Sequence, residues 1–326
     1  MELLKDKGVL TLIDELKKEI RTRGFEDKAL PRFIFICGEQ ILDNSGKLIN
    51  EEILEANNNV RYFIMKNFNK YTYTGEYGKE SHPAQCVISE YLYSTDKTID
   101  ILTFEEVLAE ISEYIIIITE SPGTFCELGA FALHDSFVDK IIVINEDNPK
   151  FKSSFISLGP IKKIENQNEK NVILYSNKSL LKSSLEFNDM IREIATKEVK
   201  FTPNLDSQAL NLKNLIYELL NLTELFEPIT PYELEFLYKR IREITNYTIT
   251  NKDKHKIFSF KRVINLMVDM KVISYENGYC RVNKNVTCTN TMFTMNRKKI
   301  NDFRTKYLCR VYKIEPERME SFIWIY

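Results

Sequence analysis

The sequence contains few of the residues that build metal sites and disulfide-bonded folds. Its 326 residues include six cysteines and three histidines, and no two cysteines form a CxxC pair. Zinc sites and disulfide frameworks need closely spaced or paired residues of these types, so neither is expected. The chain also lacks a Walker-type phosphate-binding loop. We therefore expect reduced thiols in a cytoplasmic protein, with no bound metal and no cofactor.

Long apolar runs are missing as well. None approaches the roughly 18 residues that a membrane-spanning helix needs, and we expect no membrane partner. The N-terminus carries charges of both signs, unlike a signal peptide. Apolar residues then recur at helical spacing as far as Ile20, which predicts a helix that packs on the rest of the protein.

Short apolar runs that alternate with helical patterns fill the first two-thirds of the chain. The candidate strands are residues 33–37, 115–118, 141–144 and 172–175, with 62–65 as a weaker fifth. Helical patterns cover residues 104–112 and 127–136. Strands that are apolar on both faces are covered by helices on each side. We therefore predict an α/β fold with a Rossmann-like, three-layer parallel sheet.

The pattern breaks after residue 197, and we predict two domains, 1–197 and 198–326. The second contains three helical patterns, at about residues 210–225, 231–244 and 259–271. Asn277-Gly278 then lies between alternating apolar residues, which is a strong signal for a β-hairpin. Three helices followed by a hairpin indicate a smaller winged helix-turn-helix domain.

The charge is distributed unevenly between the two parts. Residues 251–326 contain 16 Lys and Arg against 7 Asp and Glu, so the first 250 residues carry a net charge of −11 within a total of −2. A basic C-terminal part indicates contact with nucleic acid, although winged helices also dock on proteins. Salt-dependent phosphate contacts are expected from Lys261, Arg262, Arg281, Lys284, Arg297, Lys298 and Lys299.

The candidate catalytic residue is Glu127, which follows the apolar run 115–118 and a glycine-bearing turn at Gly123-Thr124. Open α/β sheets bind small ligands at the carboxyl ends of their strands. We expect Glu127 in the first turn of a helix, where the helix dipole favours the ionised carboxylate. Such a carboxylate can attack or stabilise the anomeric carbon of a sugar. A purely structural glutamate at a helix start fits the same spacing.

The segment Gly123-x-x-x-Glu127-Leu128-Gly129, placed directly after an apolar strand, resembles the active-site segment of the nucleoside 2-deoxyribosyltransferase family. The resemblance is close over this motif and loose over residues 30–180. It implies that Glu127 is the nucleophile that takes the sugar from the base. An acidic residue of the preceding helix then positions the sugar, and that residue is either Glu105 or Glu106.

The resemblance also implies a sugar or phosphate loop that begins at Gly38, and substrate contacts from Ser121, Gly123 and Thr124. Family transferases usually carry an aspartate near the position of Ser121. The absence of that aspartate favours hydrolysis over transfer of the sugar to an acceptor base.

The variant motif from Ser121-Pro122-Gly123 to Glu127, combined with a winged helix, resembles the effector proteins of bacterial retrons. Such effectors are paired with a reverse transcriptase and its RNA-linked multicopy single-stranded DNA in anti-phage defence. The resemblance implies these two partners, a small-molecule nucleotide substrate and a homo-oligomer. NAD is the expected substrate, because its loss halts a cell.

Two alternatives to this toxic N-glycosidase remain open from the sequence. The first is a nucleoside 2-deoxyribosyltransferase that exchanges bases. The second is a winged-helix DNA-binding regulator whose α/β domain senses a nucleotide without cleaving it.

Overall fold

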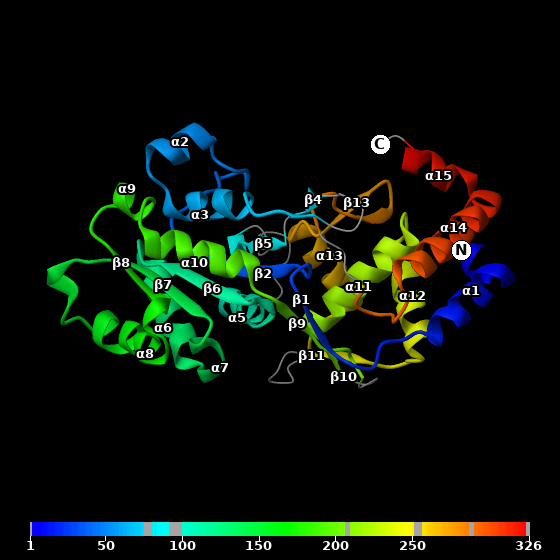
Figure 1. Ribbon diagram of the computed structural model, residues 1–326, viewed down its shortest axis with the longest axis horizontal. Helices are drawn as coiled ribbons and strands as arrows, with labels where there is room; N and C mark the ends of the chain where they lie inside the picture. The colour runs from blue at the N-terminus through cyan, green and yellow to red at the C-terminus, as the bar shows by residue number, and fades with distance from the viewer. Residues whose placement is uncertain are drawn as a thin grey trace. The chain divides into compact units, whose positions relative to one another are not determined.

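The computed structural model describes residues 2–74, 80–81, 83–90, 100–205, 209–250, 256–286 and 290–323 (Figure 1). The chain forms two compact units. The α/β unit is Pro31–Val199, and the helical unit combines Met1–Leu30 with Lys200–Tyr326. The division predicted near residue 197 lies close to the second crossing between the units. Residues 1–30, however, belong to the helical unit rather than to the α/β unit with which the sequence grouped them.

Helix α1 (Lys7–Lys17) explains this grouping. It buries four apolar side chains on one face and contacts α12 (Pro231–Arg242) and α14 (Arg297–Ile314) of the helical unit. Beyond α1, the backbone N–H of Arg21 donates to the carbonyl of Met292 at 2.9 Å, and that of Thr294 donates to Glu19 at 2.8 Å. The N-terminal segment is therefore part of the core of a unit whose other residues follow residue 199.

The α/β unit is built on a five-stranded sheet in which every pairing is parallel, as predicted. The strand order is β5-β2-β6-β7-β8. Four of the strands coincide closely with the predicted ones. The strands are β2 (Arg32–Cys37), β5 (Ala84–Val87), β6 (Tyr114–Ile118), β7 (Ile141–Glu146) and β8 (Val172–Tyr175).

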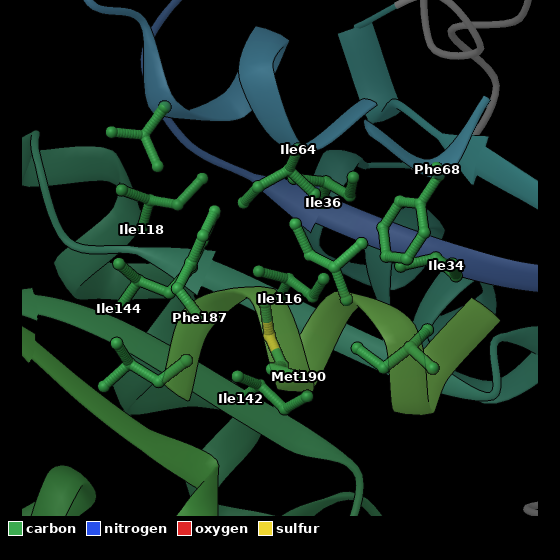
Figure 2. Packing of buried hydrophobic residues seen from close by; sticks show 14 of the residues in the cluster. Ile34, Ile36, Ile64, Phe68, Ile116, Ile118, Ile142, Ile144, Phe187 and Met190 are labelled. Atoms are coloured by element: carbon green, nitrogen blue, oxygen red, sulfur yellow. The ribbon is translucent and has the colours of Figure 1, made fainter. Parts of the chain in front are cut away.

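Helices cover both faces of this sheet, which gives the three-layer arrangement. Because side chains alternate along a strand, Ile34 and Ile36 of β2 point to one face and Phe33 and Phe35 to the other. The first face packs on α3 (Val60–Phe68) and α10 (Leu185–Thr196), as Figure 2 shows. On the second face, Phe35 meets Phe131 of α6 (Pro122–Leu133) edge to face, with ring centroids 5.9 Å apart.

The other helices of this unit connect the strands. They are α2 (Glu51–Ala56), α5 (Ile101–Ile111), α6 (Pro122–Leu133), α7 (Asp135–Val138), α8 (Lys162–Gln167) and α9 (Lys178–Leu181). Single turns of helix lie at Pro149–Phe151, Ser157–Ile161 and Glu169–Asn171. Strand β3 (Tyr73–Thr74) pairs antiparallel with β4 (Glu80–Ser81).

The weaker strand predicted at residues 62–65 is wrong, because these residues lie in the middle of α3. A short apolar run does not by itself distinguish a strand from a buried helix. The side chain of Asn59 caps this helix by accepting from the N–H of Tyr62 at 2.9 Å. The remaining strand of the sheet is β5, whose sequence Ala-Gln-Cys-Val gives a much weaker apolar signal.

The helical unit contains the three helices and the hairpin that the sequence predicts. The hairpin turns at Asn277 and Gly278, both with positive φ, as a two-residue turn requires. The winged helix-turn-helix assignment itself stays a prediction. The main elements are α11 (Leu212–Phe226), α12 (Pro231–Arg242), α13 (Phe260–Asp269), β13 (Ile273–Glu276), β14 (Tyr279–Val282), α14 (Arg297–Ile314) and α15 (Pro316–Ile323).

Five further short strands lie outside the predicted pattern. Three of them form one sheet in the order β10-β11-β12, and β1 pairs with β9. They are β1 (Phe25–Asp27), β9 (Val199–Phe201), β10 (Ala209–Asn211), β11 (Thr248–Thr250) and β12 (Lys256–Phe258). A short 3₁₀ turn, Leu3–Lys5, precedes α1. None of the helices in the described ranges is long and apolar enough to span a membrane.

Candidate active site

The strand order of the α/β unit fixes where a ligand-binding crevice is expected. Along the chain, the sheet grows outward in opposite directions from β2, first to β5 and then to β6. In open parallel sheets, ligands bind at the carboxyl ends of the strands where this order reverses. Here that point lies between β2 and β6, which end at Cys37 and Ile118. Residues 38–39 and 119–121 therefore meet at one edge.

Glu127 lies on α6, which leaves this edge directly after β6. The helix begins at Pro122, because Ser121 is its N-cap and proline suits the first helical position. The prediction that Glu127 lies in the first turn is therefore wrong, since five helical residues precede it. Its Oε2 atom is buried and has no hydrogen-bond partner among the described residues.

A second carboxyl group lies beside Glu127. Glu105 of α5 is 6% exposed, and the Glu127 carboxylate acts on it electrostatically. The hydroxyl of Ser89, in the segment after β5, hydrogen-bonds Glu105 and also donates to Glu90 at 3.3 Å. We call Glu90, Glu105 and Glu127 the acid cluster.

The structure separates Glu105 from its neighbour Glu106, which the sequence left as alternatives. Glu106 points away from the acid cluster toward His134, with its Oε1 3.9 Å from the Nδ1 of His134. Its side chain is 29% exposed, whereas Glu105 is buried. Only Glu105 is therefore placed to act together with Glu127.

The cation beside the acid cluster is Arg61, a buried residue of α3. Its guanidinium binds the Glu90 carboxylate through two bonds, Nη1 to Oε1 at 2.6 Å and Nη2 to Oε2 at 2.8 Å. Nη2 also donates to the backbone carbonyl of Ile36 in β2 at 2.7 Å. Two parallel bonds of this kind fix both position and orientation of an arginine.

Burial and charge alter the proton affinity of the acid cluster. Burial, together with the Glu127 carboxylate, raises the pKa of Glu105 to about 7. Burial also raises the pKa of Glu127, against the opposing effects of the Cys37 thiol and Arg61. Burial would also raise the pKa of Glu90, but the hydrogen bonds and the positive charge of Arg61 outweigh burial. The pKa of Glu90 is therefore below its ordinary value.

The Cys37 thiol, at the end of β2, hydrogen-bonds the Glu127 carboxylate. Burial, together with the Glu127 and Glu105 carboxylates, raises the pKa of Cys37 well above its usual range. The thiol is therefore protonated and is a donor to Glu127 rather than a nucleophile. The five cysteines in the described ranges are all unpaired.

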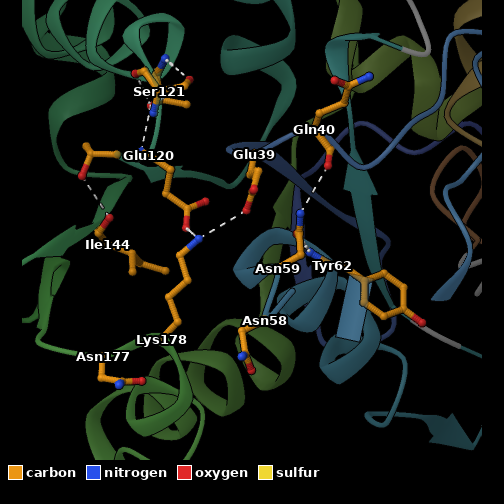
Figure 3. Close-up of polar contacts among 12 residues, drawn as sticks. Glu39, Gln40, Asn58, Asn59, Tyr62, Glu120, Ser121, Ile144, Asn177 and Lys178 are labelled. Carbon is orange, nitrogen blue, oxygen red and sulfur yellow. Dashed lines mark hydrogen bonds and ion pairs between the residues drawn. The ribbon is translucent and has the colours of Figure 1, made fainter. Parts of the chain in front are cut away.

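A cavity of about 620 Å³ opens at the same edge of the sheet. Of the acid cluster, Glu90 lines this cavity, whereas Glu105 and Glu127 are not among its lining residues. Lys178, at the start of α9, bridges carboxylates from both strand ends: it lies 2.6 Å from Glu120 and 3.3 Å from Glu39 (Figure 3). The lining residues are Gly38, Glu39, Gln40, Leu42, Asp43, Asn44, Gly46, Glu90, Glu120, Ser121 and Lys178.

Of the four predicted substrate-binding residues, Gly38 and Ser121 line the cavity. A Cβ at Gly38 would lie 2.9 Å from Cδ1 of Ile118 and 3.3 Å from Cβ of Arg61, so any larger residue here would force these side chains to shift. Gly123 and Thr124 are part of the helix start instead. Thr124 is buried, and its hydroxyl accepts from the N–H of Ser121 at 3.1 Å in a capping box.

The basic residues predicted to bind nucleic acid lie on α13, in or just after the hairpin and at the start of α14. Lys261, Lys284 and Lys298 are exposed. Two others form ion pairs within the helical unit: Arg297 with Glu224 at 3.3 Å and Lys299 with Glu19 at 2.9 Å. Arg262 and Arg281 are half-buried.

The sequence did not identify Arg61, Glu90, Glu120 or Lys178 as site residues. A single arginine within the apolar run after Asn59 was the available signal for a buried, paired cation. Glu90 gave no signal, because the strand that precedes it was not recognised. Within the described ranges, no group of three His, Cys, Asp or Glu side chains could hold a metal ion.

Two Escherichia coli proteins are similar to parts of the chain. One, whose name proposes ribosyltransferase and DNA-binding roles in retron Ec86, is 28% identical over 186 residues, which is 55% of this chain and 59% of the relative. The other, from retron Ec73 and named in the same terms, is 31% identical over 141 residues, 42% of this chain and 39% of the relative. The matches thus span less than two thirds of either relative.

A broader match covers residues 57–275, which is more than half of the chain. This segment runs from just before α3 into β13 and contains Arg61 and all three members of the acid cluster. The match shows that the chain belongs to the family of STM3845 retron effector proteins.

Proposed function

We propose that this retron effector cleaves the N-glycosidic bond of a nucleotide or dinucleotide, with Glu127 as nucleophile or as stabiliser of the anomeric carbon. The observation that carries the proposal is the buried, unpartnered Oε2 of Glu127 beside a second buried carboxyl, Glu105. Glycosidic cleavage commonly uses two carboxyl groups whose environments separate their proton affinities.

The chemistry begins with an ionised Glu127. Its carboxylate oxygen forms a bond to C1′ of the ribose while the C1′–N bond breaks and its electron pair leaves with the base. Water then attacks C1′, which frees the carboxylate, and the proton of that water passes to solvent. A nicotinamide ring is cationic before cleavage and leaves as a neutral molecule, so it needs no proton. Glu105 is then free to hold a ribose hydroxyl.

The cavity supports NAD as the substrate. Its volume of about 620 Å³ suits a small molecule, and carboxylates accept hydrogen bonds from ribose hydroxyls. Four carboxylates (Glu39, Asp43, Glu90 and Glu120) and one ammonium group (Lys178) line it. Such an acidic lining favours a cationic ring over a polynucleotide.

The family and the basic C-terminal part support the proposed partners. The names of the two Escherichia coli relatives include DNA binding. We propose that the protein is a cytoplasmic homo-oligomer that acts in anti-phage defence. Its basic residues contact the RNA-linked single-stranded DNA that a reverse transcriptase makes. The reverse transcriptase and this DNA together restrain the α/β unit. Binding to branched DNA is then expected to weaken steeply with salt. Affinity that is equal at low and high salt in a gel-shift titration would contradict this contact.

The test of the glycosidase is product analysis by chromatography, with purified protein and with its complex, on NAD and a panel of nucleosides. Glu127→Gln keeps the shape of the side chain but removes the charge, so it is expected to lower base release at least about 10³-fold without unfolding the protein. Glu106→Gln is the matched control, since Glu106 lies outside the acid cluster, and it is expected to keep wild-type activity. Equal release by Glu127→Gln and wild type would refute the assignment.

Base transfer is a second candidate, because the relatives' names propose ribosyltransferases. The same reactions, repeated with a free acceptor base, distinguish it: a new nucleoside indicates transfer, and free ribosyl product indicates hydrolysis. A ligand that binds but stays intact, with and without the partners, would favour a nucleotide sensor.

A further inference from the structure

We propose that Arg61 is a positioning residue for the acid cluster: held by the Glu90 carboxylate and by the Ile36 carbonyl of β2, its guanidinium supplies a fixed positive charge to Glu105 and Glu127. The expected effect of Arg61 on the rate of base release rests on the proposed function. The electrostatic effect of Arg61 can be measured without any turnover.

The geometry fixes the guanidinium at one point. Arg61 makes two bonds to Glu90, at 2.6 and 2.8 Å, and one to the carbonyl of Ile36, at 2.7 Å. Its stem packs under Gly38, where a Cβ would come within 3.3 Å of the Cβ of Arg61. The side chain is 1% exposed, so it cannot swing toward solvent. The positive charge is therefore static.

The polar and titratable groups that face the guanidinium come from four segments of the α/β unit. The Cys37 thiol comes from β2, Ser89 and Glu90 from the segment after β5, Glu105 from α5 and Glu127 from α6. The thiol is neutral, so three carboxyl groups share one guanidinium. Like charges in one cluster raise one another's pKa, so one carboxyl keeps its proton to a higher pH than the other two.

The arrangement decides which carboxyl keeps that proton. Glu90 is closest to the guanidinium and partly exposed at the cavity, so it is ionised. Glu127 receives the thiol hydrogen bond of Cys37 and the attraction of Arg61, and these favour its ionised form. Glu105 is more deeply buried, and the Glu127 carboxylate repels a second negative charge there.

A role in packing alone makes a different prediction from a role in electrostatics. Removing the guanidinium in Arg61→Met removes an attraction for both carboxylates, so Glu105 and Glu127 are each expected to titrate higher. Glu90→Gln keeps a side chain of the same size that still accepts from Arg61. It removes one negative charge, so the same two groups are expected to titrate lower.

The experiment is a pH titration of protein labelled with ¹³C at the glutamate carboxyl, followed by NMR, with Glu105→Gln and Glu127→Gln to assign the signals. Both cluster carboxyls are expected to move by roughly one pH unit, upward in Arg61→Met and downward in Glu90→Gln. Arg61→Lys keeps the charge and is expected to lie near wild type. Thermal unfolding verifies that each variant is folded. If Arg61→Met is not folded, the titration of Glu90→Gln decides the question.

Shifts of the same sign in both variants, or none in Glu90→Gln, would overturn the proposal. Where base release is detected, the acid limb of its pH profile, which reports ionisation of Glu127, is expected to move in the same directions. Where no substrate is cleaved, the proposed glycosidase fails, and the NMR titration still decides the role of Arg61.

Discussion

At the scale of single residues, Glu105 and Glu106 are adjacent in sequence but have opposite environments. An α-helix turns by about 100° per residue, so two neighbours can face different surroundings. Glu105 is buried against Glu127, while Glu106 lies near His134. Placing a carboxyl group at position 105 opposes folding whenever that group is ionised, which ties the stability of the α/β unit to pH.

Glu105→Gln tests this link. The pKa of Glu105 is raised to about 7 in the folded protein, so between its ordinary value near 4.5 and 7 the folded state holds the extra proton. Stability falls as pH rises wherever the folded state binds more protons. The free energy of unfolding therefore falls as pH rises from 4.5 to 7, and above pH 7 the ionised Glu105 has lowered it by roughly 3 kcal/mol.

The measurement is urea unfolding of wild type and variant at pH 5 and pH 8. Glu105→Gln is expected to be more stable than wild type at pH 8, and to gain less or nothing at pH 5. Glu106→Gln, with its side chain outside the acid cluster, is expected to follow wild type at both pH values. A stability difference between Glu105→Gln and wild type that does not change with pH would contradict the link.

At the scale of elements, strands were predictable where an apolar run was long and bounded, as in β2, β6, β7 and β8. Burial on both faces produces such runs directly. The signal fails for β5, which is short and carries Gln85, and for α3, whose apolar run fits helix and strand equally well. The start of α6 was misplaced because Pro122 and Gly123 suggest a turn, whereas Ser121 before a proline is also a good helix start.

The candidate site was likewise predictable only in part. Glu127 could be identified because its motif is local in sequence. The contacts of Arg61 with Glu90, and of Lys178 with Glu39 and Glu120, join segments that only the sheet order brings together. A single sequence carries no signal for such pairings, so the charge balance of the site could not be predicted from it.

At the scale of the whole molecule, the helical unit is discontinuous in sequence. Residues 1–30 complete it, although the entire α/β unit separates them from its other residues. The sequence could predict α1 as a packing helix, but not its partner, because an amphipathic pattern indicates a buried face and not what covers it.

This discontinuity predicts how fragments of the chain behave. A fragment of residues 198–326 lacks the four side chains that α1 buries, Val9, Leu12, Ile13 and Leu16. Burial of one such side chain contributes about 1.5–3 kcal/mol, so losing four removes an amount comparable to the whole stability of a domain. The fragment is expected to lack a cooperative thermal transition in circular dichroism. Residues 31–199, which hold the complete sheet and the acid cluster, are expected to melt cooperatively on their own.

Adding a peptide of residues 1–30 to the 198–326 fragment supplies the control, because the same contacts then form between two chains. The peptide is expected to restore a cooperative transition at a temperature that rises with its concentration, as for any ligand that binds only the folded state. A variant peptide with Leu12→Asp and Leu16→Asp places charges on the buried face and is expected to restore nothing. If the 198–326 fragment alone melted like the intact helical unit, α1 would be an accessory to that core and not a part of it.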